Sequence, residues 1–153
     1  MHGPIIGVIG SGCCSRETED LARQVGTGIA LRGGVLICGG LDGVMRAAAR
    51  GAKEHGGLTV GILPGPDITE ANPFIYIAIA TNMGQARNAI IVQTAQALVA
   101  VAGGYGTLSE IALALKIGKT VVALRPEFDI NGVRRVDTVS EALDVVFDQP
   151  IAG

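Results

Sequence analysis

A glycine-rich segment holds the residues best suited to chemistry in this chain. It follows an uncharged apolar run, residues 97–102, and precedes apolar residues at helical spacing. That order predicts a buried strand, a glycine turn and a helix that opens at Thr107. Glycines let a ligand approach the backbone closely, and the free N–H groups at a helix N-terminus favour a phosphate or another anion. We therefore expect Gly103, Gly104, Gly106 and Thr107 to bind such a group.

Glu110, three positions after Thr107, has two interpretations. A carboxylate one turn into the helix lies close to whatever the glycine turn binds, where it can stabilise positive charge that develops in a reaction. The same Thr-x-x-Glu spacing is also that of a capping box, in which Glu110 would reach back to the N–H of Thr107. The local pattern is compatible with both.

The elements that must position these residues alternate along the chain. Apolar runs predict strands at 4–10, 35–38, 58–63, 74–80, 97–102 and 120–124. Helical patterns follow at 16–32, 44–55, 82–96, from Thr107 onward, and at 140–147 with Ser140 as N-cap. Residues 129–132 suggest a turn in a small hairpin. This alternation predicts one α/β domain over residues 1–153, with a doubly wound, mainly parallel sheet in a three-layer, Rossmann-like arrangement.

Two further glycine turns should lie at the same edge of this sheet. Ligands of doubly wound sheets bind at the carboxyl ends of the strands. Ser11 and Gly12 follow the first strand, and Gly39, Gly40 and Asp42 follow the second. We expect these residues to line the ligand site. Asp42 could contact ribose hydroxyls or act as the N-cap of the next helix.

The composition excludes several classes of function. The net charge is −2 and aromatic residues make up only 3% of the 153 residues, so neither a basic footprint nor stacking platforms for nucleic acid are expected. No apolar run approaches the roughly 20 residues of a membrane span. The start of the chain has no basic region typical of a signal peptide, and three cysteines do not form a disulfide framework. A cytoplasmic protein with reduced thiols is expected.

A nicotinamide cofactor is disfavoured by two departures from the dinucleotide fingerprint. Gly10-Ser-Gly12 resembles its beginning, but Ser15 stands where the third glycine belongs. The acidic residue that should end the second strand is absent, and Cys38 occupies that end. A dinucleotide oxidoreductase is therefore not expected.

Pyridoxal and metal chemistry lack the residues they need. A pyridoxal enzyme requires a lysine for its Schiff base, and the three lysines, Lys53, Lys116 and Lys119, fall at predicted helix ends away from the glycine turns. Cys13 and Cys14 are adjacent but have no nearby Cys or His pair at metal-ligand spacing. We expect no metal and no catalytic cofactor.

Two segments, Gly39–Met45 and Ala102–Glu110, resemble the signature motifs of the lonely guy (LOG) family, whose members are often labelled "possible lysine decarboxylase". The resemblance implies a phosphoribohydrolase that splits a nucleoside 5′-monophosphate into base and ribose 5-phosphate. Arg87 lies fifteen residues before Ala102, as the family's arginine lies before its motif proline. The resemblance thus implies Glu110 and Arg87 as catalytic residues. The alternative for Arg87 is a solvated arginine on a helix surface.

The sequence departs from that family at two positions. Asn88 stands where the family has lysine, and Ala102 replaces the motif proline. This pattern is similar to a branch that includes molybdenum-cofactor carrier proteins, which bind the cofactor and do not turn over a nucleotide. The alternative function is therefore a non-catalytic nucleotide or molybdenum-cofactor (pterin) binding protein. Met83, four positions before Arg87, is expected among the ligand-site residues.

The expected partners follow from these two functions. Both imply a phosphorylated small molecule as ligand, with no nucleic acid and no membrane. Alanine-rich helices, together with the habit of the LOG family, suggest a homo-oligomer, a dimer or tetramer packed through helices.

Overall fold

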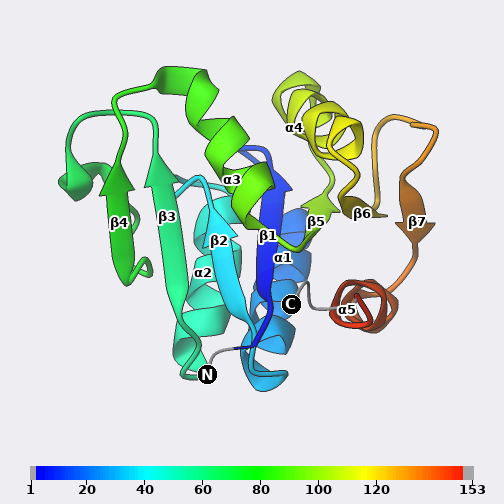
Figure 1. Ribbon diagram of the computed structural model, residues 1–153. Coiled ribbons are helices and arrows are strands. Elements are labelled where there is room, and N and C mark those ends of the chain that lie inside the picture. Colours follow the sequence, from blue (N-terminus) through cyan, green and yellow to red (C-terminus); the bar gives the residue numbers. More distant parts are fainter. Residues whose placement is uncertain (1–2, 150–153) are drawn as a thin grey trace.

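The computed structural model describes residues 3–149, which form a seven-stranded sheet covered by helices on both faces (Figure 1). The strands are β1 (Ile5–Gly10), β2 (Val35–Cys38), β3 (Thr59–Leu63), β4 (Ile77–Ala80), β5 (Ala97–Val101), β6 (Thr120–Leu124) and β7 (Arg134–Val136). The helices are α1 (Arg16–Leu31), α2 (Val44–Glu54), α3 (Asn88–Thr94), α4 (Tyr105–Lys116) and α5 (Val139–Phe147), with 3₁₀ turns η1 (Ile68–Glu70) and η2 (Gly84–Arg87). The predicted α/β class is confirmed. In the described part of the chain, no helix has the length and apolar character needed to cross a membrane.

The strand order creates the edge at which the glycine turns meet. The order is β4-β3-β2-β1-β5-β6-β7, and every neighbouring pair is parallel. The direction of winding reverses between β1 and β5, and doubly wound sheets bind ligands at such a reversal. The loops after β1, β2 and β5 therefore converge at one edge, as the sequence predicted.

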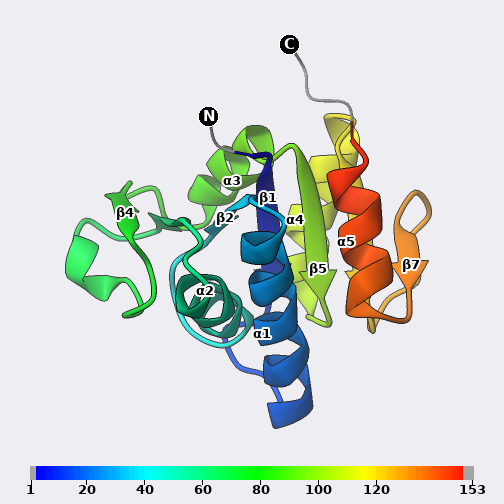
Figure 2. The ribbon, with the colours of Figure 1, turned by 90° about the horizontal axis from the view of Figure 1, so that it is seen from below.

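Two apolar cores lie between the sheet and the helices that cover its two faces. Helices α1, α2 and α5 cover one face, and α3 and α4 cover the other (Figures 1 and 2). Every residue of β5 is buried, because side chains on both faces of this central strand are covered. This explains why residues 97–101 form an uninterrupted apolar run.

Helices α1 and α2 pack unusually closely through glycine. A Cβ on Gly26 would lie 1.8 Å from the carbonyl oxygen of Ala48, and one on Gly51 would lie 2.0 Å from that of Arg23. The alanines of α2 are buried in this contact and against the sheet: Ala47, Ala48, Ala49 and Ala52. The alanine-rich face of α2 is therefore buried within the chain and does not form an exposed helical surface.

The structure corrects several predicted elements. The helix expected at 82–96 is a 3₁₀ turn followed by the seven-residue α3, and the strand expected at 74–80 begins only at Ile77. The predicted hairpin is wrong, because β7 pairs with β6 in parallel after a connection, residues 125–133, longer than a hairpin loop. The N-cap of α5 is Thr138 and not Ser140, since Thr138 Oγ1 accepts a hydrogen bond from the Glu141 N–H at 3.2 Å.

Candidate functional site

A cavity of about 380 Å³ lies at the carboxyl ends of β1 and β5. We call it the corner cavity. It is lined by Ser11, Cys13, Cys14, Ser15, Thr18, Val101, Ala102, Gly103, Gly104 and Glu127. The structure thus brings together Ser11, Gly103 and Gly104, as predicted. Sequence reasoning missed Glu127, although its place shortly after the strand 120–124 puts it at the same sheet edge.

The backbone turns sharply at Ala102 and Gly103, in the segment 102–104 that we call the glycine corner. Both residues have positive φ, 49° and 105°, and the Ala102 N–H is held by the carbonyl of Leu124 at 2.9 Å. A Cβ on Gly103 would lie only 2.3 Å from Oγ1 of Thr107. Glycine is therefore required at position 103 both by its φ and by the close approach of Thr107.

The N-terminus of α4 opens onto this corner without a side-chain cap. Its N-cap is Gly104, and no side chain makes a capping hydrogen bond there. Thr107 lies within the first turn and is buried, so the capping-box interpretation of Thr107 and Glu110 is wrong. A Cβ on Gly104 or Gly106 would meet nothing within 4 Å. Uncapped N–H groups beside open space are what an anion needs at a helix N-terminus.

Glu110 lines a different hollow. A groove of about 470 Å³, the α3–α4 groove, is lined by Gln85, Ala86, Asn88, Ala89, Tyr105, Gly106, Ser109, Glu110 and Leu113. Burial raises the pKa of Glu110 to about 7, and the nearby positive charge of Arg87 opposes this rise. Gly106 lines this groove, whereas Gly103 and Gly104 line the corner cavity. The site residues predicted at this glycine turn are therefore divided between two hollows, and Thr107 lines neither of them.

Arg87 is buried and bound to backbone, with only 6% of its surface exposed. Its Nε donates to the carbonyl of Ile62 at 2.8 Å and its Nη2 to the carbonyl of Gly39 at 3.4 Å. Its Nη1 donates to Oδ1 of Asn88. Desolvation lowers the pKa of Arg87, and Glu110 opposes this shift. The solvated-arginine alternative is wrong, because this guanidinium joins the ends of β2 and β3.

The close approach of Arg87 explains the glycine at position 39. A Cβ there would lie 2.7 Å from Nη2 of Arg87. Asn88, which stands where the LOG family has lysine, supplies an acceptor to the same guanidinium. Among the residues that the structure describes, Arg87 and Glu110 do not form an ion pair, although each shifts the pKa of the other.

Asp42 and Gly12 belong to a third hollow of about 380 Å³. It adjoins the corner cavity, since Cys13 and Cys14 line both. The expectation that Asp42 caps α2 is wrong: the N-cap is Gly43, without a side-chain cap. The Asp42 carboxylate instead lies 3.7 Å from the Arg46 guanidinium.

Gly40 and Met83 do not line any of these three hollows. Gly40 has a φ of 76°, and its carbonyl accepts the Asn72 N–H at 2.9 Å. The buried Asn72 side chain also donates to the carbonyl of Leu41 at 2.8 Å, a brace that the sequence did not reveal. Met83 is half exposed on the surface beside β4.

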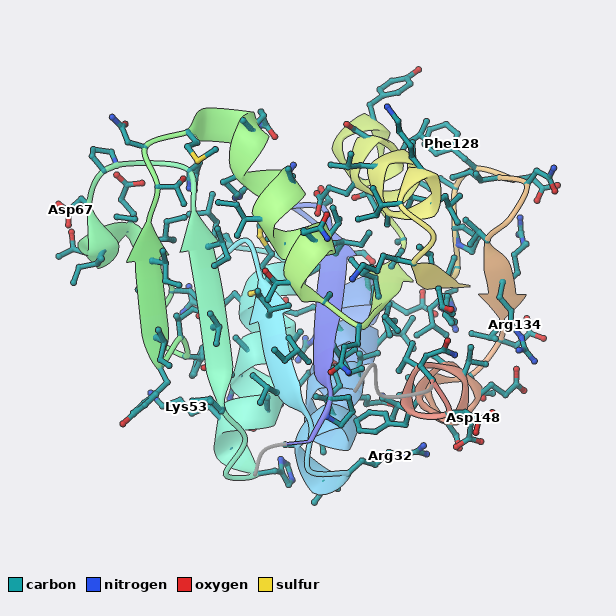
Figure 3. The ribbon with its side chains drawn as sticks, in the orientation of Figure 1. Arg32, Lys53, Asp67, Phe128, Arg134 and Asp148 are labelled. Atoms are coloured by element: carbon teal, nitrogen blue, oxygen red, sulfur yellow. The ribbon has the colours of Figure 1, made fainter. Side chains whose placement is uncertain are left out.

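Lys53, one of the three lysines considered for pyridoxal chemistry, lies away from the glycine corner. Figure 3 shows Lys53 at the end of the sheet opposite the carboxyl edge, where its Nζ donates to the carbonyl of Pro73 at 3.0 Å. Within residues 3–149, no three His, Cys, Asp or Glu side chains lie together as a metal site. A cavity of about 650 Å³ between α1 and α5 contains none of the predicted site residues.

Comparisons with known proteins agree with this architecture. The model of the SLOG cluster4 family matches residues 3–149. An uncharacterized protein of Archaeoglobus fulgidus is 55% identical over 139 residues, which cover 91% of each chain. The cytokinin riboside 5′-monophosphate phosphoribohydrolase of Mycobacterium marinum is 32% identical over 127 residues, which cover 77% of this chain and 68% of that protein.

Among solved structures, the molybdenum cofactor binding protein from the phototrophic bacterium Rippkaea orientalis superimposes with a TM-score of 0.89. The two sequences are 38% identical, and the match covers 95% of this chain and 96% of that chain. The chain therefore belongs to the SLOG cluster4 family, which confirms the resemblance to the LOG family inferred from its two glycine motifs.

Proposed function

We propose that this protein, as a single domain, binds a phosphorylated small molecule at the glycine corner and holds it without hydrolysis. The observation that carries the proposal is the separation of the two halves of the expected active site. Gly103 and Gly104 line the corner cavity, whereas Glu110 lines the α3–α4 groove. Arg87, the other expected catalytic group, donates to Ile62, Gly39 and Asn88. Binding at the corner needs neither side chain.

The ligand is proposed to be a nucleotide or a phosphorylated pterin of the molybdenum-cofactor kind. The corner cavity, at about 380 Å³, falls within the volume range of small-molecule sites. Its open helix N-terminus suits a phosphate, and the hydroxyls of Ser11, Ser15 and Thr18 can donate to or accept from a polar ring. The similarity to a molybdenum cofactor binding protein over nearly the whole chain supports this class.

A second candidate function is the phosphoribohydrolase reaction. Glu110 has a pKa raised to about 7 and faces an open groove, as a group that handles a proton near neutral pH should. As a carboxylate it would stabilise the oxocarbenium-like ribose during cleavage of an N-glycosidic bond. The phosphoribohydrolase of M. marinum supports this candidate at 32% identity.

One incubation separates the two functions. Pure protein is titrated with AMP by calorimetry, and the same mixture is analysed for free adenine by chromatography, with Glu110→Gln in parallel. If the wild type and Glu110→Gln both bind AMP and neither releases adenine, the result supports binding without hydrolysis. Adenine released by the wild type but not by Glu110→Gln would replace it with the hydrolase. Absence of binding would contradict both for this nucleotide, and a phosphorylated pterin is then titrated in its place.

Three further properties are proposed with this function. The net charge of −2 disfavours a nucleic-acid partner, so the proposed partners are the small molecule and further copies of the chain. A homo-oligomer, dimer or tetramer, is proposed, and a cytoplasmic location suits its free thiols.

A further inference from the structure

Two of the five aromatic side chains of this sequence meet beside the glycine corner. The rings of Tyr105 and Phe128 have centroids 5.7 Å apart and are tilted by 34° to one another. Tyr105 is the first residue of α4, and Phe128 lies in the connection between β6 and β7, which Figure 3 shows beside α4. We call these two residues the aromatic pair. A strand, a glycine turn and a helix do not by themselves require an aromatic side chain at either position.

The aromatic pair lies at the rim of the corner cavity. Gly104 and Glu127 both line this cavity, and Tyr105 and Phe128 directly follow them in the chain. Tyr105 also lines the α3–α4 groove, so this residue lies between the two hollows. A phosphate bound by the N–H groups at the start of α4 would therefore lie next to Tyr105.

Tyr105 presents its ring to solvent. Its exposed fraction, 83%, is the largest among the exposed large apolar side chains of residues 3–149. The glycines on either side of it leave space, because a Cβ on Gly104 or Gly106 would meet nothing within 4 Å. Phe128 is partly buried and supports the Tyr105 ring. The Tyr105 ring therefore has room for a second planar group.

Ion pairs on both sides of Phe128 in the chain position this residue. Arg125 pairs with Glu17 of α1, and Asp129 pairs with Arg135 of β7 at 3.4 Å. Exposed ion pairs each contribute little to stability, but these two connect the loop to two separate elements. The supporting ring of the aromatic pair is thus in position before a ligand binds, and such preorganisation reduces the entropy cost of binding.

We propose that Tyr105, supported by Phe128, is the site on which the planar heteroaromatic ring of the ligand stacks. Planar rings attract one another in offset arrangements, and the stacking of one base on an aromatic side chain changes a Kd by roughly 5- to 150-fold. This site rests on the proposed function, because the glycine corner must hold the phosphate of the same molecule. The ring, and not the phosphate or sugar alone, then determines which ligand binds tightly.

Calorimetry with AMP and with ribose 5-phosphate tests the role of the ring, because only AMP carries a base. The wild type should bind AMP at least about tenfold more tightly than ribose 5-phosphate. Tyr105→Ala should lose this difference without a change in its affinity for ribose 5-phosphate, and Tyr105→Phe, which keeps a ring, should retain it. The matched control is Tyr76→Ala. Tyr76 is 75% exposed and lines none of the three hollows, so this variant should leave both affinities unchanged.

Three results would overturn the proposal. The first is equal affinity of the wild type for AMP and ribose 5-phosphate. The second is an unchanged affinity for AMP in Tyr105→Ala, and the third is an equal loss of affinity in Tyr76→Ala.

Tyrosine fluorescence distinguishes a failure of this proposal from a failure of the proposed function. In Tyr76→Phe, Tyr105 is the only tyrosine of a chain without tryptophan, so its emission reports on the aromatic pair, and saturable quenching by AMP is expected. If ribose 5-phosphate binds but AMP does not quench, stacking on Tyr105 is wrong and phosphate binding at the corner stands. If AMP quenches but ribose 5-phosphate does not bind, stacking is supported and phosphate binding at the corner is contradicted. If neither occurs, both proposals are wrong.

Discussion

Arg87 Nε donates a hydrogen bond of 2.8 Å to the carbonyl oxygen of Ile62, at the end of β3. The same guanidinium reaches Gly39, after β2, and Asn88. A residue that the LOG resemblance marks as catalytic thus also holds two strand ends together. Its effect on stability and its effect on ligand binding therefore have to be measured separately.

Replacement of Arg87 by methionine should lower the free energy of unfolding by about 2–4 kcal/mol, because buried carbonyls lose their donors. Urea denaturation measures this loss. Arg135→Met is the control, since Arg135 is exposed and only loosely paired with Asp129, and its stability should not change. An Arg87→Met protein that keeps its stability but loses AMP binding would show that Arg87 acts on the ligand and not as a brace.

Two neighbouring glycines of the corner should respond differently to alanine. Gly103→Ala places a Cβ at positive φ and against Thr107, so it should lose at least about 1–2 kcal/mol of stability. Gly104→Ala meets nothing within 4 Å and should keep its stability while weakening phosphate binding, because the methyl group enters the corner cavity. Thermal unfolding and calorimetry with AMP are compared for both. Equal stability of the two variants would contradict the geometry of the corner.

Stability should fall as the pH rises toward neutrality. Burial raises the pKa of Glu110 from 4.5 to about 7, so between these values the folded chain binds the proton more tightly than the unfolded chain. The stabilisation is fully present below pH 4.5 and is lost as the pH passes 7. Its size is on the order of 3 kcal/mol, at about 1.4 kcal/mol per pKa unit between 4.5 and about 7.

Glu110→Gln is the matched variant for this effect, because its side chain stays neutral throughout. Urea denaturation from pH 5 to pH 8 should show a smaller decline in stability for Glu110→Gln than for the wild type. Parallel curves for the two proteins would mean that Glu110 titrates normally, and the raised pKa would then be wrong.

The three thiols should react in a fixed order with a disulfide reagent. Cys13 is exposed and should react first. Burial and the charge of Glu19 raise the pKa of Cys14, which slows it, and burial raises the pKa of Cys38 to about 11, so it should react only on unfolding. A spectrophotometric thiol assay follows the three phases, and Cys13→Ser identifies the first. Bound ligand should slow Cys13 and Cys14, since both line the corner cavity; unchanged rates would contradict that position for the ligand.

Much of the fold followed from local pattern. The buried runs of β1, β2 and β5 predicted a covered parallel sheet, because only a strand with both faces buried is apolar at every position. Glycines at the ends of these runs predicted turns, and the parallel arrangement requires such turns to meet at one edge. The extent of α3 and the parallel pairing of β7 were not predicted, because both depend on packing between segments distant in sequence.

The sequence by itself therefore determined the α/β class and the glycine corner, since each depends on a short contiguous pattern and on backbone freedom at one or two glycines. It predicted that the helix opens at Thr107, whereas α4 begins at Tyr105, and only the structure showed that no side chain caps this helix. Only the tertiary structure decided that Arg87 binds Ile62 and Gly39, 25 and 48 positions away. It also decided that Glu110 faces a groove separate from that of Gly103 and Gly104. The physical reason is that cavities and buried hydrogen bonds form where separate elements pack, and no local pattern encodes which elements those are.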